Sequence, residues 1–168
     1  DSAHEIATWL YHAEEAADYL WSERLGAYAA RDLRTDEPAT GVSSVAFLSY
    51  YAGISIPRRD ARLQATLRRI LEVSKYSIPS FDPEHSRFDS KRYWRGPVWA
   101  IINYIVARGL AEYGFEREAN RIRLDTREMI RGSGFYEYFD PICGSGAGGG
   151  HFAWTAAIWL AWASPMTD

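Results

Sequence analysis

The sequence has 168 residues, 47% of them hydrophobic and 24% charged, which fits one globular domain with a buried core. Its net charge is −3 with both signs mixed along the chain, so we expect no nucleic-acid partner. The single cysteine, Cys143, excludes an intrachain disulfide and a cysteine-rich metal site, and favours a reducing, cytoplasmic location. No apolar run is long enough to span a bilayer, so we expect no membrane contact.

Three segments carry apolar residues on one side only. In the first, Ile6, Trp9 and Leu10 begin a stripe that repeats every three or four residues, with acidic residues opposite. The pattern predicts amphipathic helices over about 4–21, 59–73 and 115–131. Asp60 is expected to cap the second helix.

Three other segments are apolar nearly all round, which predicts buried helices. They cover about 43–53, 98–113 and 152–163. Pro97 is expected in the first turn of the middle helix, and Gly114 is expected to end it. A brief extended piece is expected near residues 26–32 and another over 135–140, with loops between.

One-sided and all-apolar helices alternate along the chain. This order predicts an all-α fold, an α/α toroid with about three hairpins in which the inner helices line a cavity and the outer helices shield them. The connections from inner to outer helix, 54–58 and Gly114, are short. Those from outer to inner helix are long, and in a toroid all of them emerge at one end, where a site is expected.

Two of the long connections are rich in aromatic residues. They read Tyr-Trp-Arg-Gly-Pro-Val-Trp (93–99) and Gly-Phe-Tyr-Glu-Tyr-Phe-Asp-Pro (134–141). Tyrosine and tryptophan rings suit the C–H face of a sugar, and Glu137 among such rings suits proton transfer at a sugar carbon. The alternative is an ordinary aromatic core beside a solvated carboxylate.

Other side chains in these loops are candidates for sugar binding. Tyr93, Trp94 and Tyr136 are possible platforms, whereas Trp99, expected inside a helix, is also a core candidate. Arg95 either binds a substrate carboxylate or hydroxyl, or pairs with a nearby acid to hold the loop.

Several further residues have simpler explanations. Asp140 precedes a proline and indicates a turn, and His151 at a helix start is expected to be structural. The four histidines lack metal-ligand spacing, so we expect no metal and no cofactor. The glycine run 144–150 lacks the ending of a phosphate-binding loop. Nothing distinguishes Asp82, Glu84 or Asp89 as an acid.

The two aromatic motifs, together with Ile-Asn-Tyr (102–104), Arg-Gly-Leu (108–110) and Phe-Ala-Trp-Thr-Ala-Ala (152–157), resemble glycoside hydrolase family 63. That family includes processing α-glucosidases and the mannosylglycerate and glucosylglycerate hydrolases. The resemblance implies an inverting glycosidase on an (α/α)6 barrel, with Glu137 as the general base. It also implies that Tyr93, Trp94 and Trp99 line the sugar subsites, and Arg95 matches the motif.

The sequence departs from that family in one respect. The family's general acid is an aspartate well upstream, and no segment here matches it. Six hairpins are expected and three are found, so residues 1–168 resemble the C-terminal portion of the barrel, as one domain. The chain also begins without methionine, in apparent helix, as if it started within a longer protein. We therefore expect an upstream half or self-association to complete the barrel.

Two other classes of protein remain open. One is a non-catalytic sugar-binding module that keeps the aromatic platform. The other is a different α/α toroid enzyme, such as a prenyl-group transferase, which requires a zinc site of aspartate, cysteine and histidine. The single Cys143, in a glycine-rich loop, argues against that class.

Overall fold

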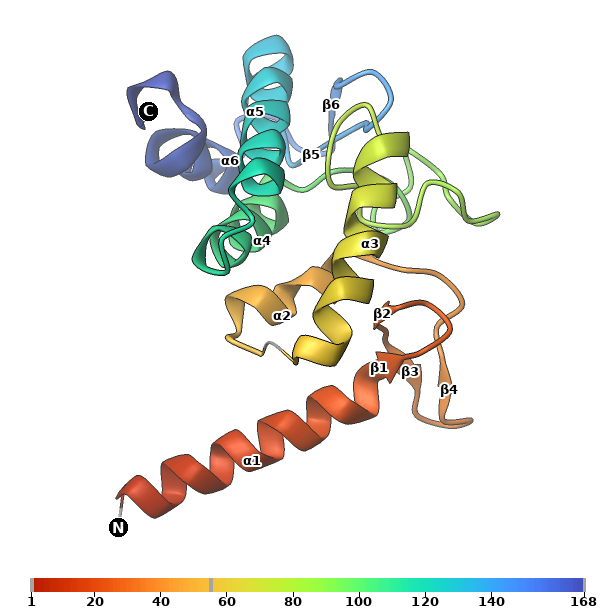
Figure 1. Cartoon of the computed structure of the whole chain (residues 1–168). Coiled ribbons are helices and arrows are strands. Elements are labelled where there is room, and N and C mark those ends of the chain that lie inside the picture. Colours follow the sequence, from red (N-terminus) through yellow and green to blue (C-terminus); the bar gives the residue numbers. More distant parts are fainter. Residues whose placement is uncertain (1, 55, 168) are drawn as a thin grey trace.

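The computed structural model describes residues 2–54 and 56–167, and it is mostly helical (Figure 1). The ends of the sequence and residue 55, part of the short connection expected over 54–58, lie outside the described residues. The long helices are α1 (Ser2–Leu20), α3 (Pro57–Val73), α4 (Ala100–Glu112) and α5 (Glu116–Ser133). The shorter helical segments are η1 (Ser44–Phe47), α2 (Leu48–Tyr51), α6 (Ala153–Ile158), the π-helical η2 (Trp159–Ala163) and η3 (Pro165–Thr167).

The described residues also form three antiparallel strand pairs of two residues each. These are β1 (Trp21–Ser22) with β2 (Ala27–Tyr28), β3 (Arg31–Asp32) with β4 (Glu37–Pro38), and β5 (Tyr138–Phe139) with β6 (Gly146–Ala147). All of them lie in the long connections, in or near the two places where extended chain is expected. Within the described part of the chain, no helix has the length and apolar character needed to cross a bilayer.

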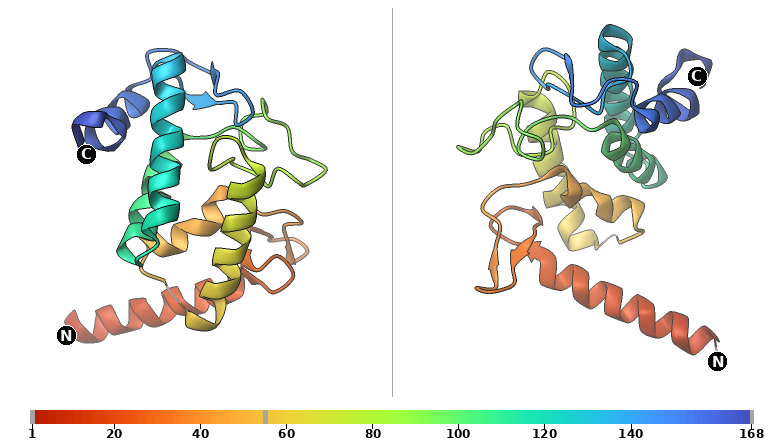
Figure 2. Two further views of the ribbon diagram at one scale, coloured as in Figure 1. Left: turned by 45° about the horizontal axis from the view of Figure 1, so that its top comes forward. Right: turned by 180° about the vertical axis from the view of Figure 1, so that it is seen from behind.

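Helix α4 lies at the centre of the helical layer and packs against α2, α5 and α6 (Figure 2). Its buried residues include Val106 and Leu110, which are fully enclosed. Helices α3 and α5 are buried along one side only, with Leu63 and Leu67 on α3 and Ile122 on α5 in the core. The predicted alternation of one-sided and enclosed helices is confirmed for these three helices.

Two helices begin at a different residue from the one predicted. Helix α3 begins at Pro57, whose fixed φ suits the first helical position, so Asp60 lies in the first turn and does not cap the helix. Helix α4 begins at Ala100, because Val98 is extended and bridges two other segments. Pro97 and Trp99 therefore precede the helix.

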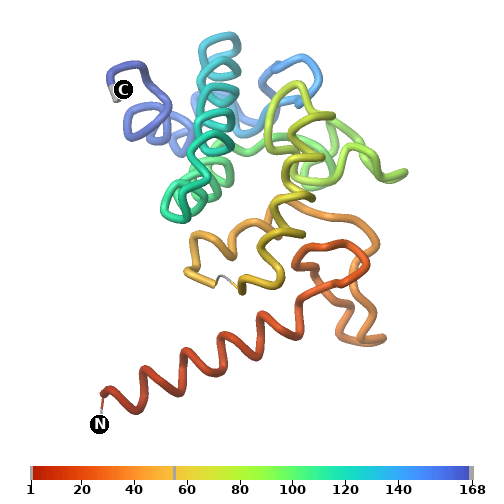
Figure 3. Tube along the Cα trace, viewed as in Figure 1, coloured from red at the N-terminus to blue at the C-terminus, as the bar shows by residue number. Residues whose placement is uncertain are grey.

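The layer of helices is open at both of its edges. Helix α1 projects from the body, as Figure 3 traces, and of its apolar stripe Trp9 and Leu10 are 68% and 62% exposed. At the other end Trp154 and Leu160 are 60% and 75% exposed. The prediction that residues 152–163 form one buried helix is therefore wrong. The segment changes from α-helix to π-helix after Ile158, and no further helix of the described chain covers it.

The long connections meet at one end of the helices through main-chain hydrogen bonds. Val98 bridges Pro79 on one side and Phe139 on the other, with N···O distances of 2.8 and 2.9 Å to Phe139. The end of the first connection joins them, where Ser43 bridges Phe81 and the Asp82 N–H donates to the Val42 carbonyl at 2.9 Å. The prediction that the long loops gather at one end is confirmed.

A buried amide fixes the second connection to the helices. Asn103 in α4 is fully buried, and its Nδ2 donates to the Ser77 carbonyl at 2.5 Å and to Thr126 Oγ1 at 2.8 Å. Its Oδ1 accepts the Ile78 N–H at 2.9 Å, while Asp125 in α5 accepts the Ser77 N–H at 3.0 Å. Because buried polar groups are costly to leave unpaired, these bonds specify the path of the loop.

Arginines on α5 bind main-chain carbonyls of neighbouring segments. Arg121 Nη2 lies 3.3 Å from the Ser74 carbonyl, at the end of α3. Arg123 Nε and Arg127 Nε donate to the carbonyls of Trp162 and Ala163, at 2.8 and 2.6 Å, and so hold the end of η2. One outer helix therefore fixes the chain on both of its sides.

The packing of α4 on α2 requires a glycine. A Cβ at Gly109 would lie 2.3 Å from the main-chain nitrogen of Tyr51, so the two helices touch backbone to backbone there.

We predict that Gly109→Ala lowers the free energy of unfolding by about 1–3 kcal/mol, because the helices must separate. Gly132→Ala is the matched control, since a Cβ at Gly132 has open space. It should raise stability by at most about 1 kcal/mol. Equal urea midpoints for the two variants would contradict this account of the contact.

Candidate active site

Two aromatic segments from different connections form one cluster. Tyr93 and Trp94 belong to the connection between α3 and α4, and Tyr138 belongs to the connection between α5 and α6. The Tyr93 and Tyr138 rings meet edge to face, with centroids 5.4 Å apart. The bridge between Val98 and Phe139 brings these segments together, so the cluster follows from the way the loops pair.

Glu137 is held at this junction by one contact from each side. Tyr93 Oη donates to Glu137 Oε1 at 2.7 Å. The main-chain N–H of Gly149 donates to Glu137 Oε2 at 3.3 Å, and the Glu137 N–H donates to the Gly149 carbonyl at 3.0 Å. Glu137 is half-buried, and the site therefore presents an oriented acceptor between an aromatic loop and a glycine-rich loop.

The contact between Tyr93 and Glu137 changes the pKa of the Tyr93 phenol. The hydrogen bond to the Glu137 carboxylate raises the pKa of Tyr93 above its ordinary value, and the nearby negative charge adds to the effect. The phenol therefore stays protonated at neutral and mildly alkaline pH, which is the form that donates to a carboxylate.

The two tryptophans of the first motif are stacked. Trp94 and Trp99 have ring centroids 4.3 Å apart and planes within 5°, with Trp94 47% exposed and Trp99 only 4% exposed. Trp99 Nε1 donates to the Tyr93 carbonyl at 3.1 Å. The exposed indole thus rests on a buried one, which gives the surface a rigid flat aromatic face.

Tyr136 lies on the other side of the second motif. Its carbonyl accepts a hydrogen bond from Thr155 Oγ1 at 2.6 Å, and its ring packs so closely on Gly146 that a Cβ there would lie 2.3 Å away. The half-buried Tyr136 also packs against a group of buried apolar residues that includes Val98, Met129 and Phe139.

Arg95 and Asp140 differ in their surroundings. Arg95 is exposed, and among residues 2–54 and 56–167 its guanidinium forms no ion pair. Asp140 is buried and accepts hydrogen bonds from the Ile142 N–H at 2.8 Å and from Ser90 Oγ at 3.2 Å. These contacts agree with the prediction that Asp140 makes a turn, and they tie two connections together.

The acids of the second connection serve the scaffold. Asp82 is buried and pairs with Arg69 of α3 at 2.6 Å, and Glu84 pairs with the same guanidinium. Burial by itself raises the pKa of the Asp82 carboxyl. The hydrogen bonds from Arg69 and from the Glu84 N–H together outweigh this effect, so the pKa lies below its ordinary value.

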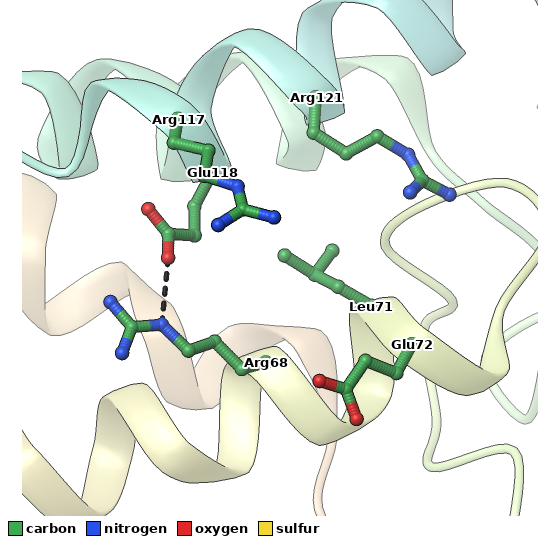
Figure 4. A pocket seen from close by; sticks show the side chains of 6 residues that line it. All are labelled: Arg68, Leu71, Glu72, Arg117, Glu118 and Arg121. Atoms are coloured by element: carbon green, nitrogen blue, oxygen red, sulfur yellow. Dashed lines mark hydrogen bonds and ion pairs between the residues drawn. The ribbon is translucent and has the colours of Figure 1, made fainter.

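A cavity of about 180 Å³ lies between α3 and α5, away from the aromatic cluster (Figure 4). Two of the three arginines that line it are paired with carboxylates. Arg68 Nε donates to the Glu118 carboxylate at 2.7 Å, and Arg121 pairs with Asp125 at 2.9 Å. The first pair joins the two outer helices, and the second lies within α5.

Two contributors to the site do not follow from the sequence motifs. Gly149 binds Glu137 through its main chain, and only the glycine-rich composition of 144–150 pointed to close backbone approach. Asn103 belongs to the Ile-Asn-Tyr motif, but its role as the anchor of the aromatic loop was not foreseen; its signal was a lone amide in a largely apolar helix.

The helical arrangement and the site define a class of protein. A crystal structure of a mannosylglycerate hydrolase of glycoside hydrolase family 63 from Thermus thermophilus, in complex with glucose, superimposes with a TM-score of 0.87 at 38% sequence identity. The match covers 94% of this chain and 41% of that one. The chain is therefore part of an (α/α)6 barrel of the glycoside hydrolase type, as predicted.

The chain belongs to the mannosylglycerate hydrolase MGH1-like glycoside hydrolase family, whose domain matches residues 1–155. Mannosylglycerate hydrolase MGH1 of Selaginella moellendorffii is 40% identical over 158 residues, which are 94% of this chain and 32% of that protein. Glucosylglycerate hydrolase of Mycolicibacterium hassiacum is 26% identical over 175 residues, covering 90% and 38%. The chain thus spans about a third of the length of these curated relatives and corresponds to their C-terminal part.

We predict that the Asp82–Arg69 pair makes stability depend on acid pH. Because the folded pKa of Asp82 is lowered, its contribution is complete above about pH 5 and is lost as the pH falls towards that pKa. Asp82→Asn should therefore cost about 1–2 kcal/mol at pH 7, discounted because Arg69 is partly exposed, and less at pH 3.5.

Urea unfolding of both proteins between pH 7 and pH 3.5 measures this difference. Glu84→Gln is the control, since Glu84 is more exposed and binds the same arginine, and it should cost less than about 1 kcal/mol. A stability gap for Asp82→Asn that stays constant with pH would show that the carboxylate charge is not responsible.

Proposed function

We propose that this chain supplies the general base and part of the sugar subsites of an inverting glycoside hydrolase acting on an α-mannoside or α-glucoside. The observation that carries the proposal is Glu137, oriented by Tyr93 and Gly149 at an aromatic cluster that includes the exposed Trp94 indole. A carboxylate with its oxygens fixed, next to a flat apolar face for a sugar ring, suits the activation of water at an anomeric carbon.

The reaction needs two carboxyl groups with different roles. Glu137 removes a proton from water, whose oxygen attacks the anomeric carbon on the face opposite the leaving group. A carboxylic acid on the other side gives its proton to the departing oxygen, so that the bond to the aglycone breaks and the anomeric configuration is inverted. The two groups lie roughly 6.5–9.5 Å apart in inverting enzymes. We place the acid in the upstream part of the barrel.

The aromatic cluster forms the sugar-binding surface in this proposal. The exposed face of Trp94, supported by Trp99, contacts the C–H face of the ring. Tyr136, on the other side of the second motif, contributes a further aromatic ring. Arg95, whose guanidinium is exposed, is available for a hydroxyl or a carboxylate of the aglycone.

Mannosylglycerate is the first substrate to test. The relatives named mannosylglycerate hydrolase are 37–40% identical to this chain, whereas the glucosylglycerate hydrolase is 26% identical. Both compounds carry a glycerate carboxylate, for which an arginine fork is a suitable partner. The mannose and glucose forms differ at one hydroxyl, so both belong in the assay.

We further propose that the remaining part of the barrel covers the open ends. The exposed side chains of α1 and α6–η2 form apolar faces at the two edges of the helical layer, and the relatives are about three times as long. Such faces are rarely left in water. A polypeptide equivalent to the upstream part of the Thermus thermophilus hydrolase fits both the architecture and the 38% identity.

We predict that the chain alone releases little sugar, and that joining it to the upstream part of the Thermus thermophilus hydrolase gives an active barrel. In that barrel Glu137→Gln should lower kcat by at least about 10³-fold, because the amide cannot take the proton from water, while the fold is kept. Sugar release from mannosylglycerate and glucosylglycerate measures the rate, and proton NMR of the first product anomer tests inversion.

The same assay separates the alternatives. Sugar binding that persists in both proteins, with turnover in neither, would favour a carbohydrate-binding module on the same scaffold, which the exposed Trp94 face also suits. Turnover by the isolated chain that Glu137→Gln abolishes would refute the upstream acid. Retention of the anomeric configuration would refute the inverting mechanism.

We predict that the isolated chain self-associates through its open edges. Leu10→Glu should shift the chain towards monomer in light scattering, because it places a charge in the exposed stripe of α1. Leu33→Glu is the matched control, since Leu33 is 89% exposed but lies in the turn between β3 and β4. A monomeric wild-type chain would contradict the proposal that the apolar faces of α1 and α6–η2 are covered by other polypeptide.

A further inference from the structure

We infer that Tyr93 is a positioning residue for Glu137, and that its phenol and the Gly149 N–H together fix the plane of that carboxylate. The inference builds on the proposed function, in which Glu137 activates water. It assigns to Tyr93 a role that differs from a platform for the sugar.

The phenol reaches the carboxylate across two connections. Tyr93 precedes α4 and Glu137 follows α5, and Tyr93 Oη lies 2.7 Å from Glu137 Oε1. A donor this close to a carboxylate makes a charge-assisted hydrogen bond. The orientation of the carboxylate thus depends on the loop that carries the aromatic motif.

The main chain of Tyr93 is held in an uncommon conformation. Its φ is +24°, a value that residues other than glycine rarely adopt. Trp99 Nε1 binds its carbonyl, and the Tyr93 ring stands at 90° to Trp99 and 89° to Tyr138. Such a conformation persists only where the surroundings fix it, and here the fixed group points at a carboxylate.

The second oxygen is fixed by the glycine-rich loop. Gly149 N–H donates to Glu137 Oε2, and a Cβ at Gly148 would lie 2.6 Å from that oxygen. The φ of Gly148 is also +75°, so a side chain there is disfavoured twice. The loop can therefore approach the carboxylate only because it consists of glycine at this point.

One donor on each oxygen stops rotation of the carboxylate and leaves acceptor sites for water. An ionised carboxylate offers about four lone-pair positions, of which these contacts use two. The phenol remains a neutral donor because the contact raises the pKa of Tyr93. A base held in this way keeps the direction in which it accepts the proton.

The first test needs no activity. In the full chain carrying ¹³Cζ-labelled tyrosine, the Tyr93 signal, assigned with Tyr93→Phe, reports ionisation of the phenol. We expect Glu137→Gln to lower the pKa of Tyr93 towards its ordinary value, because the carboxylate that disfavours the phenolate is gone. An unchanged Tyr93 titration would overturn the inference even if the hydrolase activity is found.

The second test uses the completed barrel. Tyr93→Phe keeps the ring and removes the donor, so kcat should fall by about 10–100-fold with KM little changed. In the Glu137→Gln background, Tyr93→Phe should cause no further loss, because Tyr93 acts through Glu137. A rise in KM or weaker sugar binding with kcat unchanged would instead make Tyr93 a sugar contact.

Tyr76→Phe is the matched control. Tyr76 Oη also donates to a glutamate, Glu128 Oε1, at 2.7 Å, but neither residue belongs to the aromatic cluster. Tyr76→Phe therefore removes the same kind of hydrogen bond at a place outside the site. In this variant kcat should stay within about twofold of the wild-type value. An equal loss in the two variants would indicate a general effect on stability and overturn the inference. If no barrel is active, the proposed function fails. The titration of Tyr93 still shows whether its phenol binds the Glu137 carboxylate.

Discussion

The site depends on one buried amide. Asn103 lies in the first turn of the central helix α4 and satisfies its polar atoms with the main chain of residues 77 and 78 and with Thr126. Apolar packing allows many arrangements of the chain, whereas a buried amide allows few, because each of its hydrogen bonds must be satisfied in a fixed direction. The path of the long aromatic loop is therefore set by hydrogen bonds at its base, far along the chain from the tyrosine and tryptophan rings that it carries.

From that anchor the loop runs into a shared set of main-chain bridges. Val98 pairs with segments of two connections, and these pairings carry the ring of Tyr93 to the carboxylate of Glu137. Tyr93 and Glu137 come from different hairpins. The geometry of the site is consequently a property of the barrel and of no single hairpin, which fits its place at the mouth of a rigid scaffold.

The sequence predicted the helices well where burial is periodic, as in α3 and α5, because a one-sided stripe records which face meets the core. It failed where tertiary pairing decides. Val98 reads as helix by composition and is extended because two other segments bind it. The surroundings of Glu137 were foreseeable as aromatic rings, but the Gly149 contact was not, since a main-chain donor leaves no side-chain signature.

The arginines of α5 bind main-chain carbonyls at the ends of neighbouring segments. Every residue has the same main-chain carbonyl, so such a contact depends on the path of the chain and does not depend on which side chains the segment carries. The side chains at the end of α3 and at the end of η2 can therefore change during divergence while the path of the main chain there stays the same.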